Sequence, residues 1–139
     1  MKFATETTSP APADALFARL EAGDRWSEWA GPLVPRSRWE VPGDPVGSVG
    51  AVRRLGIGPL SSLERIVEHV PGRRLVYVVD SWSPVHGYRA EVDLVPIEEG
   101  GTRILWSGSF TPKMPGTGPF FRWALKGIVS GFARNLARS

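Results

Sequence analysis

The sequence predicts an α+β fold in which a curved antiparallel sheet holds a long C-terminal helix. Two patterns predict it. Apolar residues recur at every second position in a series of segments up to residue 110, which is typical of strands with one buried face. Between residues 118 and 138 they recur every three or four positions, as on one face of a helix. Short connections between the strand segments favour antiparallel pairing.

Length and composition favour one domain, spanning residues 1–139. The chain has 139 residues, 42% of them hydrophobic and 22% charged, and its glycines and prolines are dispersed rather than pooled in a linker. Cysteine is absent, which excludes disulfides, cysteine zinc sites, iron–sulfur clusters and thiol catalysis. Two histidines are too few for a three-histidine metal site. We therefore expect no metal and no cofactor.

Charge and hydropathy restrict the partners. A net charge of +3 is too small for a phosphate-binding stripe, so nucleic acid is not expected. The sequence has no apolar run long enough for a transmembrane segment, and its first residues lack the apolar core of a signal peptide. These features predict a cytoplasmic protein.

The N-terminal third predicts one strand and two short helices. Residues 2–8 alternate as a strand does, and Ser9 followed by Pro10 is typical of a helix N-cap and first turn. Gly23 ends that helix, and residues 24–29 form a candidate second helix.

Six further strands complete a predicted seven-stranded sheet, so the element order is β-α-α-β6-α. They are expected at residues 36–41, 49–57, 64–66, 75–79, 86–94 and 102–110.

The turns between these strands predict their register. A turn centred on Gly58-Pro59 places Arg53 opposite Glu64, and one centred on Pro71-Gly72 places Ile66 opposite Tyr77.

A later hairpin centred on Glu98 would pair Ala90 with Trp106 and His86 with Phe110. All three registers keep the apolar residues on one common face.

The last helix has an apolar face and a basic ridge. The apolar face contains Phe121, Leu125, Ile128, Phe132 and Leu136. The polar ridge contains Arg122, Lys126, Ser130, Arg134 and Arg138, and is expected to be solvated.

Arg53 lies in the middle of an otherwise apolar strand face. A lone buried guanidinium is costly, so it needs a carboxylate, backbone carbonyls or a polar ligand. The predicted register supplies Glu64 directly opposite. The two residues are therefore either a structural ion pair or a polar anchor for a mainly apolar ligand.

Aromatic and aliphatic side chains on the same faces are candidates for a cavity wall, Trp123 among them. For any single one, a place in the plain core is the simpler interpretation. The full set of candidate ligand-binding residues is Trp39, Arg53, Leu55, Glu64, Ile66, Tyr77, Tyr88, Trp106, Phe110, Phe121, Leu125 and Ile128.

Candidates for catalysis are few. His86, expected on the same face as Tyr88, is a candidate general acid or base, as is Glu64, and Arg53 is a candidate for stabilising a developing enolate. No Asp or Ser lies at a spacing that indicates a triad with His86.

Four strings recur together in one known superfamily: residues 26–29 (WSEW), 46–53 (VGSVGAVR), 63–67 (LERIV) and 100–106 (GGTRILW). In this order they resemble the START-like (SRPBCC) superfamily, and within it the polyketide cyclase/dehydrase and lipid-transport branch. The resemblance implies the helix-grip (Bet v 1-like) fold, in which the sheet wraps the C-terminal helix around a hydrophobic cavity.

Plant hormone receptors and pollen-allergen relatives of that superfamily imply roles for individual residues. Their pocket arginine, glutamate and tyrosine would correspond to Arg53, Glu64 and Tyr88, and their gate and latch loops to residues 57–60 and 83–86. The chain departs from them in having no lysine on the inward face near Trp39 to bind an acid ligand.

Two functions follow from these observations. The first is binding of a small hydrophobic or amphipathic molecule by a carrier, sensor or lipid transporter. The second is polyketide cyclisation, aromatisation or dehydration of a carbonyl-rich substrate in the same cavity. A homodimer through exposed rings at Trp82 and Phe120 is a further expectation.

Overall fold

The computed structural model of the chain describes residues 1–56, 61–81 and 83–139. The expected fold class and element order are confirmed. The elements are β1 (Lys2–Ser9), α1 (Ala13–Glu21), the 3-10 helix η1 (Gly23–Glu28), β2 (Ser37–Val41), β3 (Val52–Leu55), β4 (Ser62–Val70), β5 (Arg74–Val79), β6 (Val85–Pro96), β7 (Thr102–Pro112) and α2 (Gly118–Arg138).

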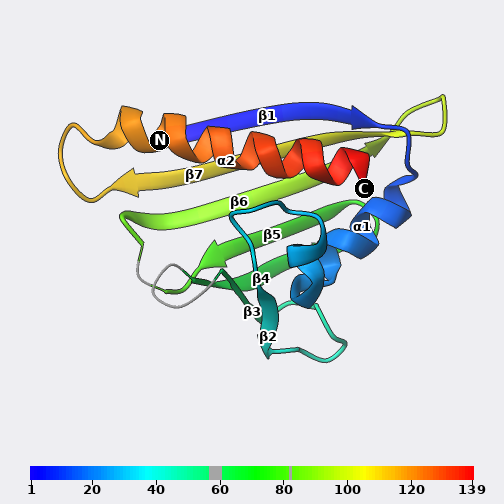
Figure 1. The fold of residues 1–139 in the computed structure, drawn as a ribbon, viewed down its shortest axis with the longest axis horizontal. Helices are drawn as coiled ribbons and strands as arrows, with labels where there is room; N and C mark the ends of the chain where they lie inside the picture. The colour runs from blue at the N-terminus through cyan, green and yellow to red at the C-terminus, as the bar shows by residue number, and fades with distance from the viewer. Residues whose placement is uncertain (57–60, 82) are drawn as a thin grey trace.

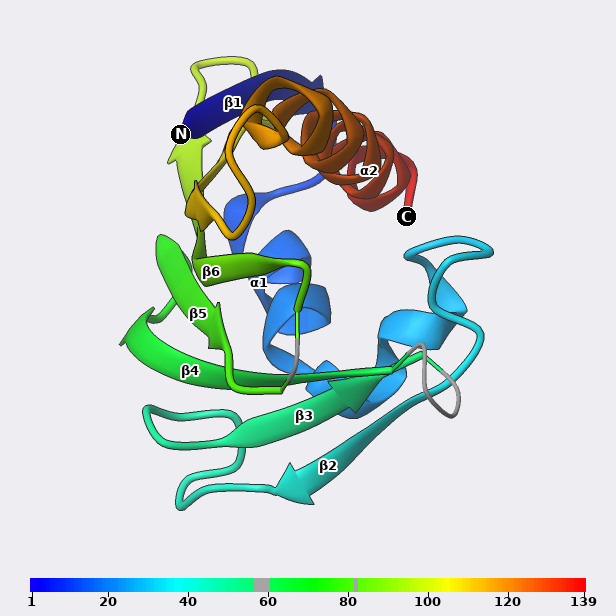
Figure 2. The ribbon, with the colours of Figure 1, turned by 90° about the vertical axis from the view of Figure 1, so that its left-hand side faces the viewer.

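The seven strands form one antiparallel sheet in the order β1-β7-β6-β5-β4-β3-β2. Figure 1 shows α2 running along the strands at the β1 and β7 end of the sheet. Figure 2 shows the sheet curling from β1 to β2, with α1 and η1 on its concave side. The sheet therefore encloses the helices on one side, and its other face is open to solvent.

Two of the predicted hairpin registers are confirmed, and the third is wrong by two residues. Arg53 pairs with Glu64, and Ile66 with Tyr77. In the last hairpin, Ala90 pairs with Gly108 instead of Trp106. The turn is centred on Glu99, one residue beyond the expected centre, because the Ile97 N–H donates to the Gly101 carbonyl. A shift of two keeps the same face inward.

His86 does not share a face with Tyr88, contrary to the sequence prediction. The register of β6 and β7 shifts between His86 and Arg89, and His86 pairs with Thr111 instead of Phe110. A bulge of this kind adds a residue to one strand and reverses the alternation beyond it. Tyr88 is consequently buried, whereas His86 is exposed.

Two local predictions near β1 and β3 are also wrong. Helix α1 begins at Ala13 without a side-chain cap, because Ser9 still belongs to β1. Strand β3 begins at Val52 because residues 48–51 form a turn, in which the Ala51 N–H bonds to the Ser48 carbonyl and Val49 is left 60% exposed.

Helix α2 has the predicted bounds, but Val129 and Ala133, which were not in the predicted apolar face, are among its most buried residues, and Ser130 of the predicted solvated ridge is half-buried. Its innermost residues are Val129, Ala133 and Leu136, and its basic side chains are exposed. Trp123 is 74% exposed, so its expected place in a cavity wall is wrong. No helix in the described part of the chain combines the length and the apolar composition needed to cross a bilayer.

Ser9 links the end of β1 to the end of α2 through a hydrogen bond. Its buried hydroxyl donates to the Ala137 carbonyl at 2.8 Å and accepts from the Ala11 N–H at 3.1 Å. We predict that Ser9→Ala lowers the free energy of unfolding by about 1–2 kcal/mol, because it leaves buried polar groups without partners. Urea denaturation measures this.

The control for that measurement is Ser130→Ala, a half-buried serine on α2. It should leave stability unchanged or slightly raised, because alanine favours helices. Equal losses in the two variants would show that the Ser9 hydroxyl has no special role.

Candidate ligand-binding cavity

A cavity of about 380 Å³ lies between the concave face of the sheet and α2. The sheet contributes Leu55, Glu64, Tyr77 and Tyr88 to its wall, all expected from the sequence. The wall from α2 includes Phe121, Leu125 and Ile128, which were also expected.

Other parts of the wall were not predicted. Two come from the segment after η1, two from α2 and the others from the sheet and its loops. They are Leu33, Val34, Ser61, Ser62, Val79, Ser83, Pro84, Val85, Val129 and Phe132. Ser83, Pro84 and Val85 belong to the segment expected to match a latch loop, and that role stays a prediction. The expected gate segment, residues 57–60, lies outside the described residues. Serines carry no periodic signal, so the strand pattern did not point to Ser61 and Ser62.

The remaining expected residues lie behind that wall or beside it. Arg53, Ile66, Trp106 and Phe110 are buried in the core, and Trp39 is partly buried against it. Direct contact with a ligand stays a prediction for every residue of the set.

Arg53 is fully buried and has contacts on several sides. Its Nε and Nη2 donate to Oε1 of Glu64 at 3.1 and 2.9 Å. Its guanidinium carbon lies 3.8 Å from the ring centroid of Trp26 and 4.5 Å from that of Tyr77. Stacking on two aromatic rings and pairing with a carboxylate offset part of the cost of burying the charge. Nη1 of Arg53 is buried without a hydrogen-bond partner among the described residues.

Trp26 is the residue of this cluster whose role the sequence did not indicate. It is fully buried, and its indole N–H donates to the Leu20 carbonyl at 3.0 Å. Gly23 lets η1 approach the sheet, since a Cβ there would lie 2.8 Å from both the Arg53 side chain and the Trp39 ring. The string WSEW is the only sequence signal, and its spacing does not show which ring turns inward.

Glu64 lies between Arg53 and the cavity. Its side chain is 10% exposed and forms part of the cavity wall. Burial raises the pKa of Glu64, and the Arg53 guanidinium offsets part of this rise. Burial also raises the pKa of Tyr77 and of Tyr88, so both keep their protons at neutral pH.

The other catalytic candidate lies away from this cluster. His86 is exposed at the start of β6 and is not among the residues of the cavity wall. Within residues 1–56, 61–81 and 83–139, no three histidine, aspartate or glutamate side chains lie close enough together to hold a metal ion.

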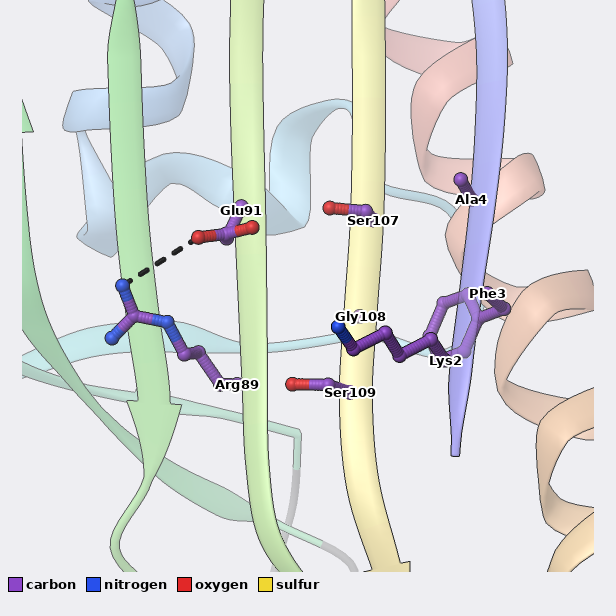
Figure 3. A pocket seen from close by; sticks show the side chains of 8 residues that line it. All are labelled: Lys2, Phe3, Ala4, Arg89, Glu91, Ser107, Gly108 and Ser109. Carbon is purple, nitrogen blue, oxygen red and sulfur yellow. Dashed lines mark ion pairs between the residues drawn. The ribbon is translucent and has the colours of Figure 1, made fainter.

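A second hollow, of about 530 Å³, lies on the outer face of the sheet (Figure 3). It crosses β1, β7 and β6, and its lining includes Ser107, Ser109 and an ion pair between Arg89 and Glu91 at 3.5 Å. The cavity beneath α2 has the more aromatic wall and contains the buried carboxyl group, so it is the candidate site.

Comparison with known proteins agrees with this architecture. A family model described as "Polyketide cyclase / dehydrase and lipid transport" matches residues 1–139. The chain belongs to this family. A search of curated proteins found no match.

Several solved structures share the fold of this family member. It is similar to a START superfamily protein from Mycobacterium smegmatis (TM-score 0.83, 11% identity, 99% of this chain and 94% of that one). It is also similar to Ara h 8.0201 (TM-score 0.71, 17% identity, 100% and 99%). A third is the di-domain ARO/CYC StfQ from the steffimycin biosynthetic pathway (TM-score 0.79, 19% identity, 99% and 49%). At these identities the likeness shows the fold alone.

The Arg53–Glu64 pair should contribute strongly to stability. We predict that Glu64→Gln lowers the free energy of unfolding by about 3 kcal/mol, because it leaves a buried guanidinium without a countercharge. The double variant Arg53→Met/Glu64→Leu should lose less than the sum of the single losses. Chemical denaturation measures both.

An exposed pair provides the control. Arg65 donates to Asp80 at 2.9 Å on the outer face of the sheet. Asp80→Asn should cost less than about 1 kcal/mol, because solvent screens this pair. Equal losses of unfolding free energy in Asp80→Asn and Glu64→Gln would contradict the prediction that the buried pair contributes more to stability than the exposed one.

Proposed function

We propose that the protein binds one small hydrophobic or amphipathic molecule in the cavity beneath α2, as a carrier, sensor or lipid-like transporter does. An apolar wall with a few placed polar groups is the usual composition of a small-molecule site. Aliphatic and aromatic side chains from α2 would supply affinity, and Glu64, with the neighbouring hydroxyl groups, would orient the ligand.

The observation that carries this proposal is the incomplete burial of α2. Phe121, Leu125, Ile128 and Phe132 face the cavity and are only half-buried. Removing apolar surface from water is favourable by about 25 cal/mol per Å². A ligand that covered these side chains would gain that contribution.

Filling the cavity should abolish binding. We predict that Ile128→Trp weakens binding of the neutral fluorescent probe N-phenylnaphthylamine by about tenfold or more, because the indole would occupy the ligand's volume. The matched control is Lys126→Trp, which adds the same ring on the exposed face of α2. Fluorescence titration measures both, and unchanged binding by Ile128→Trp would contradict the proposed site.

The second candidate is a cyclase, aromatase or dehydratase that acts on a carbonyl-rich substrate. The carboxyl group in the cavity wall favours it, because a raised pKa suits Glu64 to donate and accept protons. The covered guanidinium of Arg53 makes it a poorer candidate for contacting an enolate oxygen.

Turnover of a poly-β-ketone surrogate separates the two functions. If Glu64 transfers protons, Glu64→Gln should lower the rate by about a hundredfold or more while the probe still binds. Equal rates in the two proteins and in buffer would remove the catalytic candidate and leave the binding function.

A homodimer remains a proposal. Phe120 is 60% exposed and lies against Trp123 with ring centroids 6.4 Å apart, whereas Trp82 lies outside the described residues. Analytical ultracentrifugation of the unmodified protein and of Phe120→Ser would show whether this ring holds two copies together.

A further inference from the structure

We infer that the cavity selects ligands whose polar group donates hydrogen bonds, such as a hydroxyl or an amine, and discriminates against carboxylates and phosphates. The inference rests on the proposed binding function and names the class of ligand. It follows from two observations: Glu64 and not Arg53 lines the cavity, and Arg53 bonds to only one of the two Glu64 oxygens.

The positive charge of the pair is hidden from a ligand. The Arg53 side chain is 0% exposed, with Trp26 and Tyr77 against the guanidinium and Glu64 bonded to it. Arg53 is not among the residues of the cavity wall, whereas Tyr77 and Glu64 are. An anion in the cavity would therefore meet the covering groups before the cation.

The negative charge of the pair is presented to the ligand. Both hydrogen bonds from Arg53 go to Oε1 of Glu64. The other oxygen, Oε2, has among the described residues one long contact, from the Ser62 hydroxyl at 3.4 Å. A carboxylate oxygen accepts about two hydrogen bonds, so Oε2 of this wall residue has unused accepting capacity.

The rest of the polar wall carries hydroxyl groups. Ser62, Ser83, Tyr77 and Tyr88 can each donate or accept, and no described lysine, arginine or histidine forms part of the wall. An alcohol could therefore donate to Oε2 of Glu64 and accept from a neighbouring hydroxyl. An ammonium group could donate to the same oxygen with the added strength of opposite charge.

A carboxylate or phosphate has no such arrangement. It would lose its hydration, face the Glu64 carboxyl group, and find no uncovered cation to compensate. If Glu64 took up a proton on binding, the free energy of that protonation would be subtracted from the affinity. Either route weakens an anionic ligand relative to a neutral one with the same hydrocarbon chain.

Three ligands that differ only in their polar group test this: decanol, decylamine and decanoate, titrated into the unmodified protein by calorimetry at pH 7. We expect decanol and decylamine to bind about tenfold or more tightly than decanoate. Decanoate binding as tightly as decanol would overturn the inference and leave the proposed function standing. Binding of none of the three would overturn the proposed function, and the inference with it.

Substitution of Glu64 locates the discrimination. Glu64→Gln should improve decanoate and weaken decylamine, because it removes the negative charge and leaves that of Arg53 unbalanced. The matched control is Glu68→Gln on the same strand, whose carboxylate bonds to Arg74 at 3.0 Å and is absent from the cavity wall. This control should keep the ranking of the unmodified protein.

Ser62→Ala provides a second variant in case Glu64→Gln does not fold. It removes one hydroxyl beside Oε2 without changing charge, and should lower decanol affinity several-fold. The matched control is Ser130→Ala, which lies outside the cavity wall and should leave decanol affinity unchanged. A ranking that stays the same in Glu64→Gln, or decanol binding that is unchanged in Ser62→Ala, would overturn the assignment of the polar group to this end of the cavity.

Discussion

The burial of the Arg53 guanidinium is the constraint on which the centre of this structure depends. A charge without solvent is tolerated only where a countercharge and polarisable groups surround it. Strand pairing places Glu64 beside Arg53, and the close approach of η1, which Gly23 permits, places Trp26 against it. The same requirement joins the register of β3 and β4 to the position of a helix far from them in sequence.

That cluster also determines the polarity of the cavity. The sheet curves away from α2 and leaves a space with largely apolar walls. Glu64 forms part of that wall and Arg53 does not. A fold shared with Ara h 8.0201, a START superfamily protein and the ARO/CYC protein StfQ does not specify a function by itself. A function has to be argued from the chemistry at the cavity wall.

The register of the sheet shows how far sequence reasoning extends. Alternation and turn residues correctly predict the pairing of Arg53 with Glu64, because Gly58-Pro59 indicates a single centre for the turn. The predicted register of the last hairpin is wrong by two residues. Its turn contains two adjacent glutamates and two glycines, which allow more than one centre for the turn. The bulge near Gly87 was also missed. The alternation of His86, Tyr88 and Ala90 is the same with or without the bulge, and Gly87 in the strand is its only sequence signal. The bulge moves His86 to the surface.

The sequence by itself determined the α+β class, the strand order along the chain, the bounds of α2 and the presence of an arginine among apolar neighbours. These are local properties, set by periodicity and by turn residues. Only the tertiary structure decided that Arg53 is covered by Trp26 and that Glu64 faces the cavity. The physical reason is that Trp26 comes from a short 3-10 helix whose single inward ring is selected by packing against the sheet, and no periodic pattern in six residues records that choice.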